Sequence, residues 1–503
     1  MDVVVGIDIG TSNMKFLAAT RGGRTIKLIS KKMQIDRPRP GWSEFNILTL
    51  KQNLLTGLEE LKDSLPNGTK IASIGIDSIG ESIVGLSEEN EIITPCPTWY
   101  DRRTEHSIRE FGVDNETWYN KTGMVDDDIY TIYRINWFRK RYPEDVKHIS
   151  KWLCVADYAV YLLTGHQITT PSLACRTGFL DRSKLNWNTD FLEMAHVKET
   201  YLPELVNQCS ISVPSNEYTE RTTGIAKGTP VVHAGHDHAC ATFGCTISRP
   251  GLIIDSSGTA EAVNTLVTEP MSYEKSMKGS YDCYPFVLPG LYAFSGHLPQ
   301  SGGLFEWAGR LVTGTRHDSY LTIGHMEELF TEASESPVGS KGVRIVPFLE
   351  GSGSPWHQRN QSASIHGLKS HHTRGDVIRA VFESTAYWLR WNVNVISKLL
   401  GGEFLSVIAS GGGAKTQLWL EIKSAMLKRP FKLPHIGESA ALGAALVAGL
   451  STEFFASVEE AMELPDVSWS EFDAGTQKYE EYEDLAHELH SLFARELEQH
   501  RGD

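Results

Sequence analysis

The 503-residue sequence has few cysteines, no long apolar run and fewer basic than acidic side chains. The seven cysteines are scattered and form no C-x-x-C pair, so we expect reduced thiols rather than a disulfide or zinc framework. A net charge of −15 argues against nucleic acid or anionic lipid as a partner. The weakly polar stretch 440–450 is too short and too rich in alanine and glycine to span a bilayer.

A secretory signal is also missing from the start of the sequence. Met1 leads directly into the apolar run 3–7, without a basic segment or a cleavage site. We therefore expect a cytoplasmic protein. Apolar residues make up 41% and charged residues 22%, which predicts a globular chain, and its length predicts two to four domains.

Several common catalytic motifs do not occur. The chain has no G-x-x-x-x-G-K Walker A loop, no G-x-G-x-x-G after its first apolar run, no G-x-S-x-G and no H-E-x-x-H. His487 and His490 have the wrong spacing for zinc and are expected on the surface of the last helix. Dinucleotide-dependent oxidoreduction is disfavoured by these absences.

Apolar runs that alternate with turns open the chain and predict a β-meander followed by helices and further strands. Strands alternating with helices predict an α/β fold, and the meander predicts mixed sheets. The expected strands are 3–10, 14–20, 25–33 and 71–80, and the expected helices include 48–65, 375–400 and 417–427.

A weak internal repeat predicts two related halves. Segments 3–19 and 251–266 each place an aspartate near the end of an apolar strand, then a Gly-Thr turn, then a second apolar strand. We expect an N-terminal lobe over 1–248 and a C-terminal lobe over 249–503, although chance similarity is an alternative.

The polar residues of the first turn are suited to binding phosphate, because phosphate oxygens need several donors close together. Asp8, at the end of the preceding strand, could hold Mg²⁺ through water. A plain hairpin with polar turn residues is the alternative. The candidate phosphate ligands are Gly10, Thr11, Ser12 and Asn13 in this turn and Lys15, which adds a positive charge two residues beyond it.

Two further turns could bind a nucleotide. Gly258 and Thr259 form a second Gly-Thr turn, which on its own is a weak signal. The loop 411–413 lies between a predicted strand and a predicted helix, where glycine allows close approach of adenine or phosphate.

A general base is predicted at the turn that contains Asp237, between His236 and His238. A carboxylate at such a turn can accept the proton of a substrate hydroxyl as it attacks phosphorus. A metal site that uses the nearby histidines, including His233, is an alternative, but their spacing does not put several ligands on one face. A purely structural turn is a further alternative.

Together, these segments resemble the FGGY family of carbohydrate kinases across nearly the whole chain. The most specific piece is Ala363-Ser364-Ile365-His366-Gly367-Leu368, followed by Asp376-Val377 and Ala380-Val381-Phe382-Glu383. The other matching pieces, in family order, are the first hairpin, TWYDRRT at 98–104, the turn at Asp237, SSGTAE at 256–261, PFLEGSGSPW at 347–356, the segment 410–430 and ESAALGAALVAG at 438–449.

The resemblance implies a two-lobed, actin-like (ribonuclease H-like) ATPase fold with mixed sheets and a cleft between the lobes, and it implies ATP and Mg²⁺ as cofactors. Asp237 would be the catalytic base, and Asp8 and Asp237 would hold Mg²⁺. Thr11, Ser12, Asn13, Gly258 and Thr259 would cradle the β- and γ-phosphates, and Gly411, Gly412 and Gln417 would line the nucleotide pocket.

For the sugar, Glu81 matches a position where the glycerol-kinase branch has Arg-Glu, but here Gly80 replaces the arginine. The Gln-Met-His motif usual in the xylulose-kinase branch is absent as well. The candidates for contact with sugar hydroxyls are Gly80, Glu81, Asp101, Arg102 and His238.

The predicted function is ATP-dependent phosphorylation of a hydroxyl of a small sugar, a ketose or deoxyketose. A four- or five-carbon polyol kinase of the same family is the alternative within kinases. A non-catalytic actin-like ATPase or a sugar-binding regulator is the alternative outside them. A homodimer is an expected assembly, since dimers are common in the family.

Overall fold

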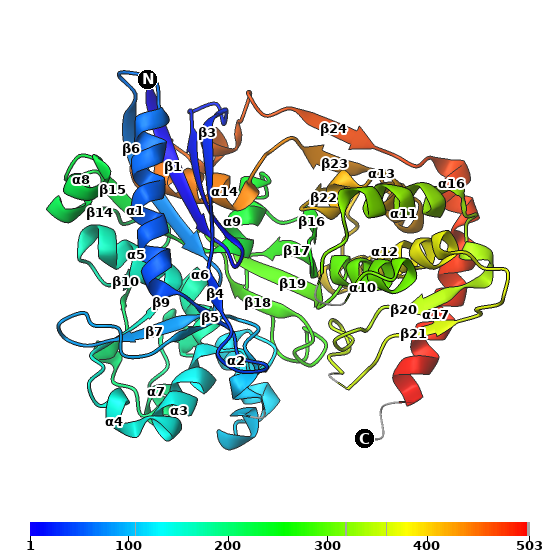
Figure 1. Cartoon of the computed structure of the whole chain (residues 1–503), viewed down its shortest axis with the longest axis horizontal. Helices are drawn as coiled ribbons and strands as arrows, with labels where there is room; N and C mark the ends of the chain where they lie inside the picture. The colour runs from blue at the N-terminus through cyan, green and yellow to red at the C-terminus, as the bar shows by residue number, and fades with distance from the viewer. Residues whose placement is uncertain (106, 317–318, 359, 500–503) are drawn as a thin grey trace.

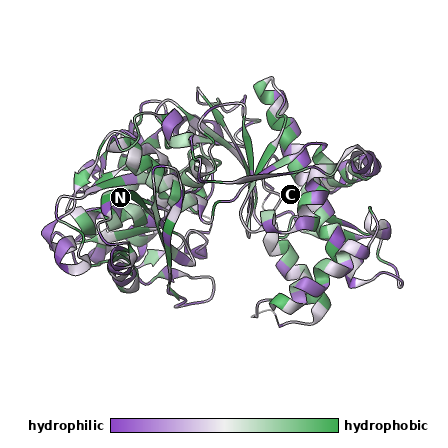
Figure 2. Cartoon of the chain, turned by 90° about the horizontal axis from the view of Figure 1, so that it is seen from above, coloured by the Kyte–Doolittle hydropathy of each residue, from purple (hydrophilic) through white to green (hydrophobic). Residues whose placement is uncertain are grey.

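The computed structural model describes residues 1–105, 107–316, 319–358 and 360–499. Two lobes lie side by side, each built around a mixed β-sheet with helices on its faces (Figure 1). The view from above shows the N-terminus in one of the two lobes (Figure 2). The α/β fold with mixed sheets that the sequence predicts is thereby confirmed.

The first sheet has six strands in the order β14-β15-β6-β1-β2-β3. β1 pairs antiparallel with β2 and parallel with β6, and β6 pairs parallel with β15. The predicted meander and the predicted strand 71–80 are therefore present. The bounds are β1 Asp2–Ile9, β2 Asn13–Ala19, β3 Thr25–Lys32, β6 Lys70–Ser78, β14 Val213–Pro214 and β15 Pro230–His236.

One face of this sheet is covered by α1 (Ile47–Ser64), one residue earlier at each end than predicted. Its leucines at 50, 54, 58 and 61 recur on one face and are buried against alternate residues of β1. Asn46 caps the helix by accepting a hydrogen bond from the backbone amide of Thr49 at 3.0 Å. This layer of helix and strand fixes the position of β1 and of the turn that follows it.

The second sheet has seven strands in the order β18-β19-β17-β16-β22-β23-β24. β16 pairs antiparallel with β17 and parallel with β22, which repeats the arrangement of β1, β2 and β6. The two halves are related as the internal repeat predicts. The bounds are β16 Ile253–Ser257, β17 Glu261–Val267, β18 Asp282–Pro285, β19 Tyr292–Leu298, β22 Val407–Ser410, β23 Phe431–Pro434 and β24 Trp469–Phe472.

Helices of the second half pack on this sheet, and the predicted helices over 375–400 and 417–427 are confirmed. α12 (Arg374–Leu400) begins with a capping box in which Thr373 and Asp376 satisfy each other's backbone amides. Gly401, with φ 68°, ends it in the left-handed conformation that glycine adopts without strain. The other helices of this lobe are α10 Gly302–Thr313, α11 Ile323–Glu335, α13 Gln417–Leu427, α15 Val458–Met462, α16 Thr476–Glu481 and α17 Glu483–Gln499.

The remaining elements are short and lie mostly in the first half. They are β4 Ile35–Asp36, β5 Glu44–Phe45, β7 Ile83–Leu86, β8 Cys96–Pro97, η1 Arg102–Thr104, η2 Ser107–Glu110, α2 Asn115–Thr122, α3 Thr131–Arg141, α4 Pro143–Val146, β9 Lys151–Cys154, α5 Val155–Thr164, β10 Ile168–Thr169, α6 Pro171–Ala174, η3 Cys175–Thr177, β11 Leu180–Asp181, β12 Asn186–Trp187, α7 Thr189–Ala195, η4 Glu199–Tyr201, β13 Glu204–Leu205, α8 Glu217–Thr223, α9 Asp237–Gly244, η5 Ser340–Gly342, β20 Arg344–Val346, β21 Ser364–His366 and η6 Gly413–Lys415.

Helix α14 (Ser439–Ser451) belongs to the C-terminal half but packs on β1, β6 and α9 of the first lobe. The approach is at backbone distance. A Cβ at Gly6 would lie 1.7 Å from the carbonyl oxygen of Ala441, and a Cβ at Gly443 would lie 1.9 Å from that of Cys240. The division into 1–248 and 249–503 stays a prediction. Helix α14 comes from the second of these segments but packs on the first.

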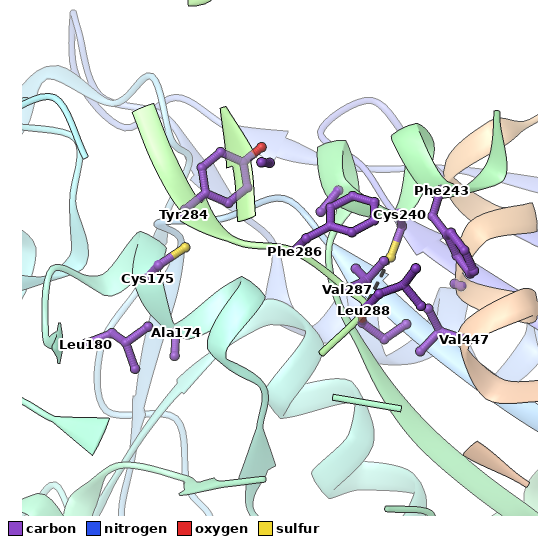
Figure 3. Close-up of a cluster of buried hydrophobic side chains, with 14 of the residues drawn as sticks. Ala174, Cys175, Leu180, Cys240, Phe243, Tyr284, Phe286, Val287, Leu288 and Val447 are labelled. Atoms are coloured by element: carbon purple, nitrogen blue, oxygen red, sulfur yellow. Dashed lines mark hydrogen bonds between the residues drawn. The ribbon is translucent and has the colours of Figure 1, made fainter. Parts of the chain in front are cut away.

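A continuous apolar core fills the space around α9 and α14. Phe243 and Cys240 of α9 and Val447 of α14 lie beside residues 286–288, which follow β18 (Figure 3). All seven cysteines are free, as predicted. Within the ranges given above, no helix has the length and apolar character needed to cross a membrane.

Candidate active site

Three aspartates lie at the ends of three neighbouring parallel strands of the first sheet. Asp8 is near the end of β1, Asp77 near the end of β6, and Asp237 directly follows β15 as the first residue of α9. Asp8 is the register partner of Asp77, and Asp77 is that of Gly235. Since the carboxyl ends of parallel strands meet at one edge of a sheet, the three carboxylates share that edge.

Burial is the first cause that raises the pKa of each of these three carboxyl groups. Burial and then the charge of Asp237 raise the pKa of Asp8 to about 7, while Lys15 acts in the opposite direction. Burial raises the pKa of Asp237 to about 7, with a further contribution from Glu81. The pKa of Asp77 is held well above its ordinary value by burial and by the other two aspartates. An edge with this excess of negative charge is suited to a divalent cation.

Asp77 strengthens this argument, because it is fully buried and the polar groups that act on its carboxylate are two other aspartates, Asp8 and Asp237, and the thiol of Cys240. Among the described residues, no three His, Cys, Asp or Glu side chains lie close enough together to hold a metal ion by themselves. Mg²⁺ commonly keeps several waters and binds one or two carboxylates together with phosphate oxygens. The residues present therefore fit Mg²⁺ that arrives with a nucleotide.

The turn before Asp237 fixes its carboxylate. Gly235 has φ 118°, and a Cβ there would lie 2.9 Å from Ser172 Oγ, so glycine is needed at this point. Asp237 Oδ1 accepts a hydrogen bond from the backbone amide of His238 at 2.6 Å and lies 3.1 Å from His236 Nε2. Burial holds the pKa of His236 well below its ordinary value, so its imidazole is neutral. The contacts of Asp237 with His238 and His236 both involve Oδ1, and no hydrogen bond between Oδ2 and another described residue is seen.

His233 does not join a metal site with these histidines. Its ring nitrogens lie 2.9 Å from Asp157 Oδ1 and 3.1 Å from Thr170 Oγ1, in the buried interior of the first lobe. This gives His233 a structural role beside α5.

The first hairpin turn, between β1 and β2, is closed by the Gly10 amide, which donates to the carbonyl oxygen of Asn13 at 3.1 Å. Thr11 Oγ1 accepts a hydrogen bond from Trp99 Nε1 at 3.2 Å, and Ser12 is exposed. Lys15 Nζ lies 2.6 Å from Glu438 and 3.9 Å from Asp8. The predicted phosphate ligands thus share one turn beside Asp8.

The second hairpin turn, between β16 and β17, exposes Gly258 and Thr259. Their carbonyl oxygens accept hydrogen bonds from the amides of residues 301–303, at the start of α10. Gly411, with φ 82°, packs on this hairpin, since a Cβ there would lie 2.4 Å from the carbonyl oxygen of Ser257. Gly412 has no atom within 4 Å of its ideal Cβ position, and Gln417 is exposed. The predicted nucleotide residues are therefore accessible on one edge of the second sheet.

The start of α14 lies near both the first hairpin and the glycine loop of the second sheet. Glu438, which precedes α14, pairs with Lys15 of the first hairpin. Burial raises the pKa of Cys245 to about 11, although hydrogen bonds with Ser439 and Ser410 act to lower it. Ser410 directly precedes the glycine loop, and Ser439 is the first residue of α14. The glycine loop and the first hairpin thus approach the start of α14.

A buried charge network lies beneath the second hairpin. Lys423 Nζ donates to Asp255 and to Ser257 Oγ, at 2.6 Å each, and lies 3.0 Å from Glu261. Burial raises the pKa of Glu261 to about 8 against the effect of Lys423. Ser301, which precedes α10, donates to the same glutamate at 2.5 Å. Asp255 is therefore engaged in the fold rather than open to a ligand.

Glu81 lies near Asp237 and pairs with a residue that the sequence did not single out. Arg176, in η3, donates from Nε to Glu81 Oε1 at 2.6 Å, and its Nη2 contacts the same oxygen. Asp282 of β18 lies 3.8 Å from Arg176 Nη1. Burial lowers the pKa of His238, and the charges of Arg176, Glu81 and Asp282 also act on it.

Two of the predicted sugar ligands lie elsewhere. The side chain of Asp101 has no exposed surface, and it accepts hydrogen bonds from the Ser43 amide and from the backbone and guanidinium of Arg103. This gives Asp101 a structural role in place of the predicted substrate contact. Arg102 is 64% exposed, reaches Glu350 of the other lobe at 3.3 Å, and lines a surface cavity of about 590 Å³ with Arg39.

Three residues of the site were missed from the sequence. Asp77 carries a signal, since it ends an apolar strand as Asp8 does. Arg176 and Asp282 carry none, because an arginine in a short 3₁₀ helix and an aspartate at the start of a strand are common. Only tertiary contact brings them to Glu81.

Comparisons with known proteins agree with this geometry. A model of the N-terminal domain of the FGGY family of carbohydrate kinases matches residues 3–244, and a model of the C-terminal domain of that family matches residues 255–452. A xylulose kinase from Staphylococcus xylosus is 25% identical over 469 residues, which cover 92% of this chain and 94% of that protein. A gluconokinase from Bacillus subtilis (strain 168) is 25% identical over 453 residues, which cover 88% of this chain and 86% of that protein.

The solved structure of a ligand-bound xylulose kinase from Lactobacillus acidophilus is similar with a TM-score of 0.87. The two chains are 21% identical, and the match covers 98% of this chain and 97% of that one. This similarity shows that the two-lobed fold extends over the whole chain.

Proposed function

The chain belongs to the FGGY family of carbohydrate kinases and is an ATP-dependent carbohydrate kinase, and we propose that it phosphorylates one hydroxyl of a small ketose or deoxyketose with Asp237 as the catalytic base. The observation that carries the proposal is the position of Asp237, at the strand edge that also holds Asp8 and adjoins the first hairpin turn. A carboxylate next to a phosphate site can receive the proton of an attacking hydroxyl.

The two hairpin turns would hold the triphosphate of ATP. Thr11, Ser12 and Asn13 offer donors beside Asp8, and Gly258 and Thr259 offer a second exposed turn. Gly411, Gly412 and Gln417 would contact the nucleoside. Mg²⁺, when bound, would neutralise charge on the phosphates, and Asp8 and Asp237 are the carboxylates we assign to hold it.

The protein's part in the chemistry is to orient the hydroxyl and to take its proton. A free alcohol has a pKa far above 7, so early deprotonation is unfavourable, and a loose transition state needs little of it. Asp237 accepts the proton late. Its pKa of about 7 suits a group that must gain and release a proton near neutral pH.

The small sugar itself would lie against Glu81, with Gly80 and His238 beside it. Relatives of this chain include a xylulose kinase and a gluconokinase, which supports a sugar of similar size. A cytoplasmic location accords with the seven free cysteines. The homodimer stays a prediction.

A coupled assay of ADP release, over ketoses, polyols and sugar acids, tests the function. We expect sugar-dependent ADP release, with Asp237→Asn lowering kcat by about 10²–10⁴-fold. Asp63→Asn, an exposed carboxylate of α1, is the matched control and should keep normal turnover. Near-normal turnover of Asp237→Asn on the best substrate would show that the base is another group.

A further inference from the structure

The sugar end of the site is assembled from three segments that lie far apart in the sequence. Glu81 follows β6 and has φ 57°, an uncommon conformation for a residue with a side chain. Arg176 comes from η3, and Asp282 comes from β18 of the second sheet. The backbone amide of Val125 donates to Asp282 Oδ1 at 2.7 Å and so fixes that carboxylate. Both lobes therefore contribute to this end.

Gly80 makes room for the arginine. A Cβ at Gly80 would lie 2.8 Å from Cβ and 2.7 Å from Cγ of Arg176. The stem of Arg176 thus occupies the space that any side chain at position 80 would fill. The guanidinium also lies 5.4 Å from the ring centre of Tyr130, which supports it from one side.

The guanidinium is already neutralised by protein groups. Nε and Nη2 both contact Glu81, and Nη1 faces Asp282. The guanidinium therefore does not offer the free pair of N–H donors that would bind a substrate carboxylate.

A third carboxylate lies near this end. The charges of Glu81 and Arg176 act on Asp237, and His236 Nε2 lies 3.1 Å from Asp237 Oδ1. Three carboxylates, those of Glu81, Asp282 and Asp237, thus lie near one guanidinium.

Resting on the proposed function, we propose that the cluster of Arg176, Glu81 and Asp282 makes the sugar end selective for neutral polyhydroxyl substrates and against sugar acids. Each hydroxyl of a neutral sugar can donate a hydrogen bond to a carboxylate oxygen of the cluster. An ionised acid group has no proton to donate there and meets like charge. Glu81 and Asp282 contact the sugar, and Arg176 acts as a positioning residue that holds both carboxylates.

The test compares kcat/KM for neutral ketoses and polyols with kcat/KM for aldonic and uronic acids of the same chain length. We expect the best neutral sugar to exceed the best acid by at least about 100-fold, the scale on which a site rejects an unpaired buried group. Asp282→Asn removes one charge and should narrow that ratio by about 10-fold. A merely structural role for Asp282 would lower both values together and leave the ratio unchanged.

Gly80→Ala tests the positioning of Arg176 without removing a charge. The added methyl group displaces the arginine stem, and we expect kcat/KM for the neutral sugar to fall by about 10-fold. Gly402→Ala is the matched control, since nothing lies within 4 Å of its ideal Cβ, and it should keep full activity. Circular dichroism of both variants verifies that they fold. Unchanged activity of a folded Gly80→Ala would refute the positioning role.

The outcomes separate the two proposals. If a sugar acid is the best substrate, the selectivity proposal is wrong and the kinase function stands. If no sugar, neutral or acidic, stimulates ADP release, the proposed function fails and the selectivity proposal fails with it. If neutral sugars are preferred and Asp282→Asn narrows the preference, both are supported.

Discussion

The β1–β2 and β16–β17 hairpins share one topology but differ in how their carboxylates are balanced. At the first, Asp8 lies with Asp77 and Asp237, and burial together with the charge of Asp237 raises the pKa values of Asp8 and Asp77. At the second, Asp255 and Glu261 hold Lys423 between them at 2.6 Å and 3.0 Å. The first hairpin keeps unbalanced charge for a ligand, and the second uses balanced charge to hold the fold together.

A one-residue difference in spacing explains the contrast. Asp8 lies two residues before the turn glycine Gly10, whereas Asp255 lies three residues before Gly258. Successive side chains of a strand point to opposite faces, so the two aspartates face opposite ways relative to their turns. Ile253 lies on the same face as Asp255 and packs with the helices of the second lobe, such as α12. Ile254 lies on the opposite face and belongs to the core around α9 and α14.

Removing Lys423, the cation beneath the second hairpin, should have the largest effect on stability. Lys423→Met leaves two buried carboxylates without their cation, and we expect a loss of about 3–5 kcal/mol in stability. Urea unfolding followed by tryptophan fluorescence measures it, because Lys423 Nζ lies 4.3 Å from the ring centre of Trp419.

A triple variant is the control for that measurement. Lys423→Met combined with Asp255→Asn and Glu261→Gln removes the charges together and should recover much of the lost stability. If the triple variant is no more stable than Lys423→Met, packing of the lysine stem rather than its charge holds the hairpin.

Removing one buried carboxylate beside the first hairpin should change the stability by less than Lys423→Met does, and in the opposite direction. Asp77→Asn replaces a buried carboxyl group whose pKa is held well above its ordinary value by burial and by the charges of Asp8 and Asp237, and we expect a gain of about 0.5–2 kcal/mol in stability with a loss of kinase activity. The thermal midpoint without nucleotide measures the first, and ADP release the second. A lower midpoint would mean that Asp77 is paired in solution, which would remove the contrast between the hairpins.

An effect of similar size that disappears at low pH sharpens the contrast with a carboxylate outside both hairpins, Asp376, at the start of α12. Burial alone would raise its pKa, but hydrogen bonds from Thr373, Ser336 and Lys341 hold it at about 2, below its ordinary 3.8. The ionised form therefore stabilises the fold above about pH 4, and this contribution is lost as the pH falls towards 2. We expect Asp376→Asn to cost about 1–2 kcal/mol at pH 7 and almost nothing at pH 2.

Asp63→Asn on the surface of α1 should show no such pH dependence in parallel denaturation curves. An equal loss at both pH values would mean that the Asp376 effect is one of packing and not of charge.

Much of the fold could be predicted from the sequence, because the hairpins and the long helix α12 carry their own local signals. Periodic apolar residues and a capping pair such as Thr373 and Asp376 are visible without tertiary information. The turn at Asp237 could be predicted as well, since an apolar strand that ends in a polar turn is a local pattern.

The charge balance around these turns could not be predicted. The internal repeat made Asp8 and Asp255 look equivalent, although their spacing to the turn glycine already differs by one residue. The layer that each aspartate faces follows from the packing of the two sheets and is not a local pattern. The partners of Glu81 and Asp255 are Arg176 and Lys423, which come from distant segments. Local patterns do not identify such partners.

The tight fit of Gly80 against Arg176 has a consequence for how sequences of this kind can change. A homologous chain that carries any side chain at position 80 must first vacate the volume that the arginine stem fills. A side chain at position 80 is therefore penalised unless residue 176 changes with it. In an alignment of relatives, the two columns should covary, and their joint identity should sort the sequences by the sugars they accept.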